Sequence, residues 1–134
     1  MINEFVMKNE NTPPNVMIVE DEKDLCLMLS YILKKQNFFP SCVNSLKEAV
    51  HQIKKFKPEI LFLDNHLPDG SGSDFIGQLK KLCPLTKIIM MTAHDSPKEI
   101  NKAFTKGADY FTINPFNSAT IQNMLNNIKF SSEG

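Results

Sequence analysis

The sequence has no apolar run near the roughly 20 residues that a membrane-spanning helix needs, and no signal-peptide core precedes its first predicted strand. It has no excess of charge, because 15 basic residues balance 15 acidic ones, so no overall field attracts nucleic acid or an acidic membrane. It has no CxxC pair, and we expect Cys26, Cys42 and Cys83 to be reduced, buried or half-buried thiols rather than a disulfide or a metal site. These absences predict a cytoplasmic protein that binds neither membrane nor nucleic acid directly.

The length of 134 residues is sufficient for one domain with a sizeable core, and no internal repeat or low-complexity tract divides it. We expect this domain to span residues 15–130. Residues 1–14, which end in two prolines, are predicted to be a flexible or partly foreign lead, and residues 131–134 a fraying tail or a remnant of cloning.

Five short apolar segments alternate with five segments of helical periodicity. The predicted strands are NVMIVE, FFPSCV, EILFLD, KIIMMTA and YFTI. The first predicted helix has an apolar stripe of Leu25, Met28, Leu29, Ile32 and Leu33. This alternation predicts an α/β fold with a parallel sheet that is covered on both faces.

Single residues indicate where several of these elements begin and end. Pro40 indicates that the second strand lies at the edge of the sheet or starts late. Ser45 and Ser96 are predicted helix N-caps, and Gly107 is predicted to close the fourth helix. In that fourth helix we expect Phe104 to point inward with its apolar neighbours.

Acidic residues follow two of the predicted strands. Glu20 and Asp21 come after the first strand and Asp64 ends the third. Because ligands bind at the carboxyl ends of the strands in such sheets, we expect these carboxylates to converge, to repel one another and to require a cation. Three oxygen ligands without His or Cys favour Mg²⁺, with Mn²⁺ as a substitute.

A carboxylate beside a divalent ion is suited to attack phosphorus, and Asp64 is the predicted nucleophile. Thr92 supplies a hydroxyl donor for a phosphoryl oxygen, and the small Ala93 leaves room for the group. Simpler interpretations remain: Asp21 with Asp24 caps the first helix, Asp64 is a turn residue that bonds its own backbone, and Thr92 only ends a strand.

The segments VMIVEDE, LFLDNHLPDGSG, MMTAHD and GADYFTINPF, in this order and spacing, resemble the receiver domain of two-component response regulators over residues 15–130. The resemblance implies a flavodoxin-like (CheY-like) doubly wound sheet of five parallel strands in the order 2-1-3-4-5 with five flanking helices. It further implies a cytoplasmic signalling domain in a phosphorelay, with no enzymatic activity beyond its own phosphorylation and dephosphorylation.

The same resemblance assigns roles to residues. Asp64 would accept a phosphoryl group from a sensor histidine kinase or a histidine phosphotransfer protein, and Thr92 would contact that group. Phe111 falls where the family has an aromatic switch, although it is equally interpretable as plain core. The Mg²⁺ ligands would be Glu20, Asp21, Asp64 and the backbone carbonyl of His66.

Asn114 departs from the family pattern, which has lysine before the proline of the last segment. Three carboxylates and one Mg²⁺ leave about one negative charge that a lysine would cancel, whereas asparagine offers only amide dipoles. We therefore expect intact or tighter Mg²⁺ binding with weaker phosphoryl transfer and switching.

Two other functions compete with the receiver. One is a degenerate receiver that acts as an adaptor without phosphorylation, for which Asn114 is the best support. The remote one is a phosphatase of the haloacid dehalogenase type, which needs a second acid at the position of His66.

The signal is expected to pass to an unknown downstream protein through the fourth helix, fifth strand and fifth helix, by resemblance. Lys98, Lys102 and Lys106 give that fourth helix a basic stripe, which is most simply a solvated face. His66 and His94 are expected to be exposed loop residues, and the resemblance implies a cis peptide bond before Pro115.

Overall fold

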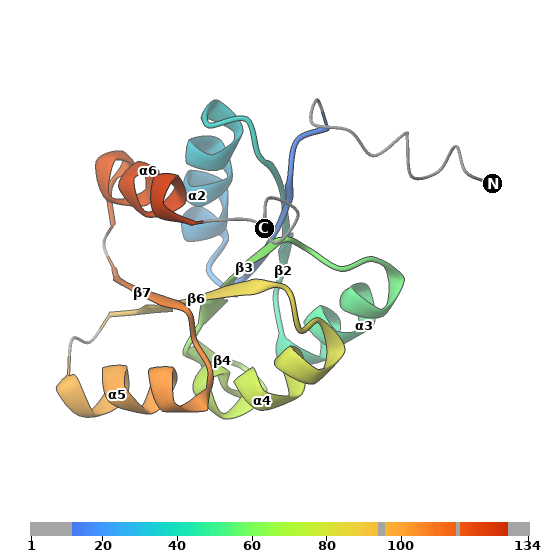
Figure 1. Ribbon diagram of the computed structural model, residues 1–134, viewed down its shortest axis with the longest axis vertical. Helices are drawn as coiled ribbons and strands as arrows, with labels where there is room; N and C mark the ends of the chain where they lie inside the picture. Colours follow the sequence, from blue (N-terminus) through green and yellow to red (C-terminus); the bar gives the residue numbers. More distant parts are fainter. Residues whose placement is uncertain (1–11, 94–95, 115, 129–134) are drawn as a thin grey trace.

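The computed structural model describes residues 12–93, 96–114 and 116–128, in which one parallel sheet is flanked by helices (Figure 1). The strands of this sheet are β1 (Asn15–Val19), β2 (Phe39–Val43), β3 (Ile60–Asp64), β6 (Lys87–Thr92) and β7 (Tyr110–Ile113). The helices are α2 (Lys23–Lys35), α3 (Leu46–Lys55), α4 (Gly72–Leu82), α5 (Pro97–Lys106) and α6 (Ser118–Asn127). The strand order β2-β1-β3-β6-β7 confirms the predicted order, with the Pro40 strand at the edge.

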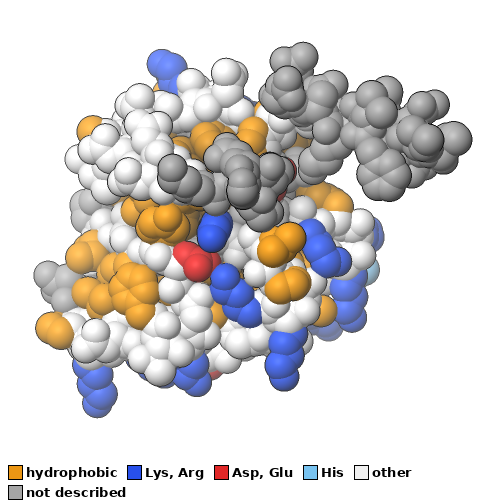
Figure 2. All heavy atoms as spheres, in the orientation of Figure 1, with side chains coloured by type: hydrophobic (Ala, Val, Ile, Leu, Met, Phe, Trp, Pro, Cys, Tyr) orange, Lys and Arg blue, Asp and Glu red, His pale blue; other side chains and the backbone are white. Residues whose placement is uncertain are grey.

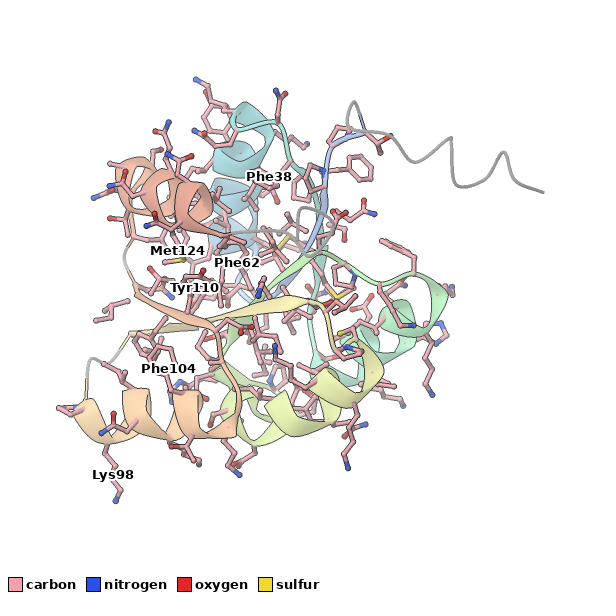
Figure 3. All side chains as sticks on the ribbon, in the orientation of Figure 1. Phe38, Phe62, Lys98, Phe104, Tyr110 and Met124 are labelled. Atoms are coloured by element: carbon pink, nitrogen blue, oxygen red, sulfur yellow. A yellow bond between two sulfur atoms is a disulfide. The ribbon has the colours of Figure 1, made fainter. Side chains whose placement is uncertain are left out.

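The helices form two layers. Helices α2 and α6 cover one face of the sheet, and α3, α4 and α5 cover the other (Figure 1). Every residue of β3 is buried, and its side chains alternate between the two faces, so that Phe62 packs toward α2 and α6 while Leu61 and Leu63 pack toward the opposite layer. Figure 3 shows Phe62 on the same side as Phe38, Tyr110 and Met124. Burial of a side chain of this size stabilises the fold by about 1.5–3 kcal/mol.

Three helices are capped at their N-termini by side chains. Ser45 accepts a hydrogen bond from the amide of Glu48 at the start of α3, and Ser96 and Asn117 act in the same way on α5 and α6. Gly107 ends α5 with a left-handed φ of 120°. The predicted roles of Ser45, Ser96 and Gly107 are confirmed.

Helix α2 begins differently. Its N-cap residue is Glu22, which makes no side-chain capping bond, so the interpretation of Asp21 and Asp24 as a helix cap does not describe this structure. The buried face of α2 consists of Cys26, Leu29, Ile32 and Leu33. Met28 was expected on that face but is 40% exposed, because Cys26 takes the inward position in the first turn.

The expectation of three reduced thiols is wrong for two of them. Cys26 on α2 and Cys42 on β2 are joined by a disulfide, with their Cα atoms 6.3 Å apart. The pairing of β2 with β1 sets Cys42 beside Ile18, on the face that α2 covers, and this long-range register has no local signature in the sequence. Cys83 is free and buried, as expected.

Phe104 was also expected to be buried, but it is 45% exposed. It projects from α5 toward β7 (Figure 3), where its ring centroid lies 6.5 Å from that of Phe111. No helix of the described ranges is long and apolar enough to cross a bilayer.

The segment after β3 is more ordered than the loop that was predicted. Strands β4 (His66–Leu67) and β5 (Gly70–Ser71) form an antiparallel pair. The side-chain oxygen of Asn65 accepts hydrogen bonds from the Ser71 hydroxyl at 3.1 Å and from the Ser73 amide at 3.0 Å. Asn65 therefore holds the two ends of the hairpin together.

Asp69, at the tip of this hairpin, fastens it to α3. Its carboxylate accepts hydrogen bonds from the amides of Leu46 and Lys47, both at 3.0 Å. These bonds, with that from Leu46 the largest cause, lower the pKa of Asp69. The loop that follows Asp64 is thus held at both its base and its tip.

Gly72 lies directly behind Asp64, and we predict that its size is essential. A Cβ atom at Gly72 would collide with the carbonyl oxygen of Asp64 and press on Leu63, whereas a Cβ at Gly77 on the same helix meets nothing within 4 Å. Gly72→Ala should lower the free energy of unfolding by about 1–3 kcal/mol. Gly77→Ala should raise it by about 0.5–1 kcal/mol. Urea denaturation of both variants checks the contrast, and a Gly72→Ala protein as stable as the wild type would refute it.

Candidate functional site

A cavity of about 560 Å³ opens at the carboxyl ends of β1 and β3. It is lined by Glu20, Asp21, Glu22, Leu25, Asp64, His66, Ala93 and Asn114. Strand β1 delivers the first two acids and β3 delivers Asp64, because neighbouring parallel strands end at the same edge of the sheet. The predicted convergence of the carboxylates is confirmed.

The three carboxylates approach closely. One oxygen of each of Glu20, Asp21 and Asp64 lies within 4.8 Å of the others. Glu20 is 2% exposed and Asp64 is 9% exposed, whereas Asp21 is open to solvent. Such a group of like charges is unfavourable unless protons or a cation compensate it.

Backbone amides satisfy part of this charge. The Glu22 amide donates to Glu20 Oε2 at 3.1 Å, and the His66 amide donates to Asp64 Oδ1 at 3.3 Å. The second contact is the local bond expected of a turn residue, so Asp64 has this role in addition to its place among the acids. In the described part of the chain, the buried Glu20 Oε1 has no hydrogen-bond partner.

A divalent cation fits this arrangement. The buried Glu20 oxygen without a partner points to a missing ligand, and the donors are all oxygens. A set of carboxylates without imidazole nitrogen or sulfur favours a hard ion such as Mg²⁺.

The electrostatics of the two buried acids agree with that fit. Burial raises the pKa of Glu20 to about 7; the amide of Glu22 opposes this shift, and the charges of Asp64 and Asp21 add to it. Burial also raises the pKa of Asp64, against the lowering effect of the His66 amide. None of the described residues that line the cavity is a lysine or an arginine.

Asn114 forms part of the cavity wall at the end of β7. The backbone N–H of Asn114 donates a hydrogen bond to the carbonyl oxygen of Thr92 at 2.7 Å, which fixes the backbone of Asn114 beside β6. Its side-chain Oδ1 is buried and has no partner among the described residues. Asn114 therefore offers the cavity an amide dipole where a lysine would offer a charge.

Thr92 and Phe111 lie next to the cavity rather than in its wall. Thr92 is the buried last residue of β6, and its neighbour Ala93 lines the cavity. Phe111 on β7 pairs with Met90 on β6 and packs against the core cluster that contains Met90. Since Met90 and Thr92 are two residues apart on one strand, Phe111 and Thr92 lie on the same face of the sheet. The arrangement is compatible with both the core and the switch interpretation of Phe111. His94 and the bond before Pro115 lie outside the described residues.

Several residues of the site were not anticipated from the sequence. The Glu22 amide and the Leu25 side chain belong to the cavity, and Asn65 orders the hairpin beside it. Leu25 was visible only as a member of a helical stripe, and Asn65 gives no signal until the hairpin register is known.

The family model of response regulator receiver domains matches residues 16–126 of this chain. Chemotaxis protein CheY of Thermotoga maritima is 30% identical over 114 residues, which cover 84% of this chain and 95% of that protein. The phosphate regulon regulator PhoB of Escherichia coli K12 is 30% identical over 103 residues, or 75% of this chain and 45% of PhoB. The chain thus matches less than half of PhoB.

Solved structures of response regulators resemble this fold. The beryllofluoride-activated receiver domain dimer of NtrC4 superposes with a TM-score of 0.79 at 32% identity, covering 84% of this chain and 93% of that one. Chemotaxis protein CheY4 of Vibrio cholerae gives a TM-score of 0.81 at 22% identity over 87% of this chain and 99% of its own, which shows a common fold.

We predict that the metal-free protein is more stable at pH 5 than at pH 8. The pKa of Glu20 is about 7 in the folded state against 4.5 as the ordinary value, so the folded state binds more protons between these limits. The resulting stabilisation is complete below about pH 4.5 and is lost as the pH rises through 7. The loss is on the order of 3 kcal/mol.

Urea unfolding in EDTA across this pH range measures the effect. Glu20→Gln should raise the stability at pH 8 and flatten the profile, because it removes the group whose proton is lost. A wild-type stability that increases from pH 5 to pH 8 would contradict the assignment of a buried, proton-binding Glu20.

Proposed function

Since this chain belongs to the family of response regulator receiver domains, we propose that Asp64 is its phosphoacceptor in a two-component phosphorelay. The observation that carries this proposal is the meeting of Asp64 with Glu20 and Asp21 in one open cavity. Of the three acids, Asp64 is the one that ends a central strand, and the backbone of Gly72 packs directly against its carbonyl group.

In the proposed reaction, a carboxylate oxygen of Asp64 attacks the phosphorus of a phosphohistidine. A P–O bond forms as the P–N bond breaks, and the imidazole leaves with the bonding electron pair and then takes up a proton. The His66 amide holds Oδ1 of Asp64 and so orients the carboxylate, which leaves the second oxygen as the nucleophile. Thr92 provides the hydroxyl that contacts the transferred group.

Glu20, Asp21, Asp64 and the backbone carbonyl of His66 are the proposed Mg²⁺ ligands. When bound, the ion neutralises charge on the acids and on the phosphoryl oxygens. The raised pKa of Glu20 means that the free cavity holds a proton part of the time at neutral pH, and this proton must leave before the full ligand set forms.

Receiver domains of this family interact with histidine kinases or phosphotransfer proteins, and we propose the same donors for this chain, in the cytoplasm. For the downstream protein we propose the surface formed by α5, β7 and α6, where Figure 2 shows hydrophobic side chains gathered between the two helices. Phe104 and Ile113 are exposed there. The ring of Phe111, which lies on the same face of the sheet as Thr92, packs against the ring of Phe104 and so connects Thr92 to this surface.

Nucleic acid is not the partner that we propose for this face. Lys98 points away from α5 (Figure 3), but Lys102 and Lys106 both lie near Oδ1 of Asp74, at 3.2 and 3.8 Å. This carboxylate partly neutralises the basic stripe and links α5 to α4. The contacts support the interpretation of the stripe as a solvated face.

A phosphorylation-independent adaptor is the second candidate, and Asn114 is the observation that favours it. No lysine or arginine is among the described residues that line the cavity, so neither kind of side chain balances the acids or a transferred phosphoryl group there. The dehalogenase-type alternative has no such support, because His66 occupies the position of its second acid.

We predict that the wild-type protein gains one phosphoryl group when it is incubated with Mg²⁺ and acetyl phosphate, and that Asp64→Ala gains none. Intact-protein mass spectrometry measures both. Failure of the wild-type protein to react, under conditions that modify a lysine-bearing receiver, would overturn the phosphoacceptor proposal in favour of the adaptor.

We predict that Asn114→Lys weakens Mg²⁺ binding about tenfold, because it brings a positive charge into the cavity that the ion must occupy. Isothermal titration calorimetry at constant pH gives the affinity. Asn114→Gln adds length without charge and should change the affinity less than about twofold. An unchanged or higher affinity in the lysine variant would show that the charge argument is wrong.

A further inference from the structure

The disulfide between Cys26 and Cys42 lies outside the reaction described above. It connects the first turn of α2 to the edge strand β2, across 16 residues of sequence. We propose that this pair is a reversible redox-modification site whose oxidised form orders the loop that carries Glu20 and Asp21. The part of the inference that concerns Mg²⁺ rests on the proposed function; the redox site itself does not.

The two sulfurs differ in accessibility, as a reversible pair requires. Cys42 is exposed on a strand that pairs on one side only, whereas Cys26 is 5% exposed on the buried face of α2. The Ser30 hydroxyl oxygen lies 3.5 Å from the Cys42 sulfur and is placed to donate a hydrogen bond to it. An external thiol or disulfide therefore reaches Cys42 first, and Cys26 follows from inside.

The chemistry balances with a low-molecular-weight disulfide as the oxidant. The thiolate of Cys42 attacks one sulfur of that disulfide, forms a mixed disulfide and releases one thiolate. The thiolate of Cys26 then attacks the Cys42 sulfur, closes the internal bond and releases a second thiolate. The two protons lost by the cysteines convert the released thiolates to thiols, and a dithiol reverses both steps.

A continuous set of bonds connects this pair to the acid cavity. The amide of Cys26 donates to the carbonyl of Glu22 at 3.1 Å, and the amide of Glu22 donates to the Glu20 carboxylate at 3.1 Å. Leu25, the residue before Cys26, lines the cavity itself. The position of the Glu20 carboxylate thus depends on the turn that the disulfide fastens.

That turn has little else to hold its start. The N-caps of α2 and α4 make no side-chain capping bond, whereas those of α3, α5 and α6 do. The covalent link to β2 takes the place of such a cap. Reduction removes the link, so the first turn frays more readily and the Glu22 amide is less firmly held against Glu20.

Thiol counting tests the site. After reduction, the wild-type protein should show three free thiols by maleimide labelling of the denatured chain, and we expect oxidised glutathione to convert it to a form with one. Cys26→Ser should trap one glutathione on the exposed Cys42, and Cys42→Ser should stay largely unmodified because Cys26 is buried. Three free thiols in the treated wild type, or equal modification of the two variants, would overturn the proposal.

Calorimetric Mg²⁺ titration tests the coupling to the cavity. The reduced wild type should bind Mg²⁺ about fivefold more weakly than the oxidised form. Its melting temperature should be about 10 °C lower. Cys83→Ser is the matched control, since this buried thiol donates to the Leu79 carbonyl on α4, and it should preserve both differences. Equal affinities in the two redox states would overturn the coupling, and the thiol count decides the redox site even in a protein that does not accept phosphate.

Discussion

The mutual repulsion of three carboxylates at one end of the sheet is the constraint on which the rest of the site depends. Parallel pairing of β1 with β3 brings Glu20 and Asp64 together, and burial deprives both of water. The fold offsets this with single amide donors from Glu22 and His66, and it leaves Glu20 Oε1 without a partner among the described residues. Buried carboxylates that lack hydrogen-bond partners favour a bound cation, because a cation relieves the repulsion among them.

Asn114 removes one of the three ways in which such a cavity is neutralised. With no lysine or arginine among its described lining residues, a proton or a metal ion has to supply most of the compensating positive charge. Burial raises the pKa of Glu20 to about 7, which favours partial protonation of this carboxyl group at neutral pH in the metal-free cavity. Proton and metal then compete for the same carboxylates, and a receiver of this kind is more sensitive to pH and to metal concentration than one with a resident ammonium group. Because position 114, just after β7, is not a lysine, a phosphoryl group on Asp64 would have no cationic side chain from this strand to contact. Phosphorylation of Asp64 and the conformational switch that follows it therefore need separate tests.

The features that were predictable from the sequence are those set by local periodicity or by the topology of parallel sheets. The parallel sheet and the convergence of Glu20, Asp21 and Asp64 follow from the alternation of elements, whereas the strand order was implied by the resemblance to receiver domains. The caps at Ser45 and Ser96 follow from short-range hydrogen bonding. The failures have a different origin. The rotation of α2 about its axis decides that Cys26 is buried and Met28 is exposed, and an apolar stripe defines that rotation only to within about one residue. The brace of Asn65 and Asp69 and the Cys26–Cys42 bond join positions whose proximity depends on tertiary structure.

Helix α2 is the element in which these separate constraints meet. Its N-terminus follows directly from the acidic loop, its buried face belongs to the core beneath β1 and β3, and its first turn is covalently attached to the edge of the sheet. On its outer side Leu27 and Tyr31 are exposed one turn apart. A displacement of the first turn of α2 moves the Glu22 amide, which donates to the Glu20 carboxylate. The start of α2 is therefore where the acid cavity and the disulfide are connected by consecutive hydrogen bonds, through the amides of Glu22 and Cys26.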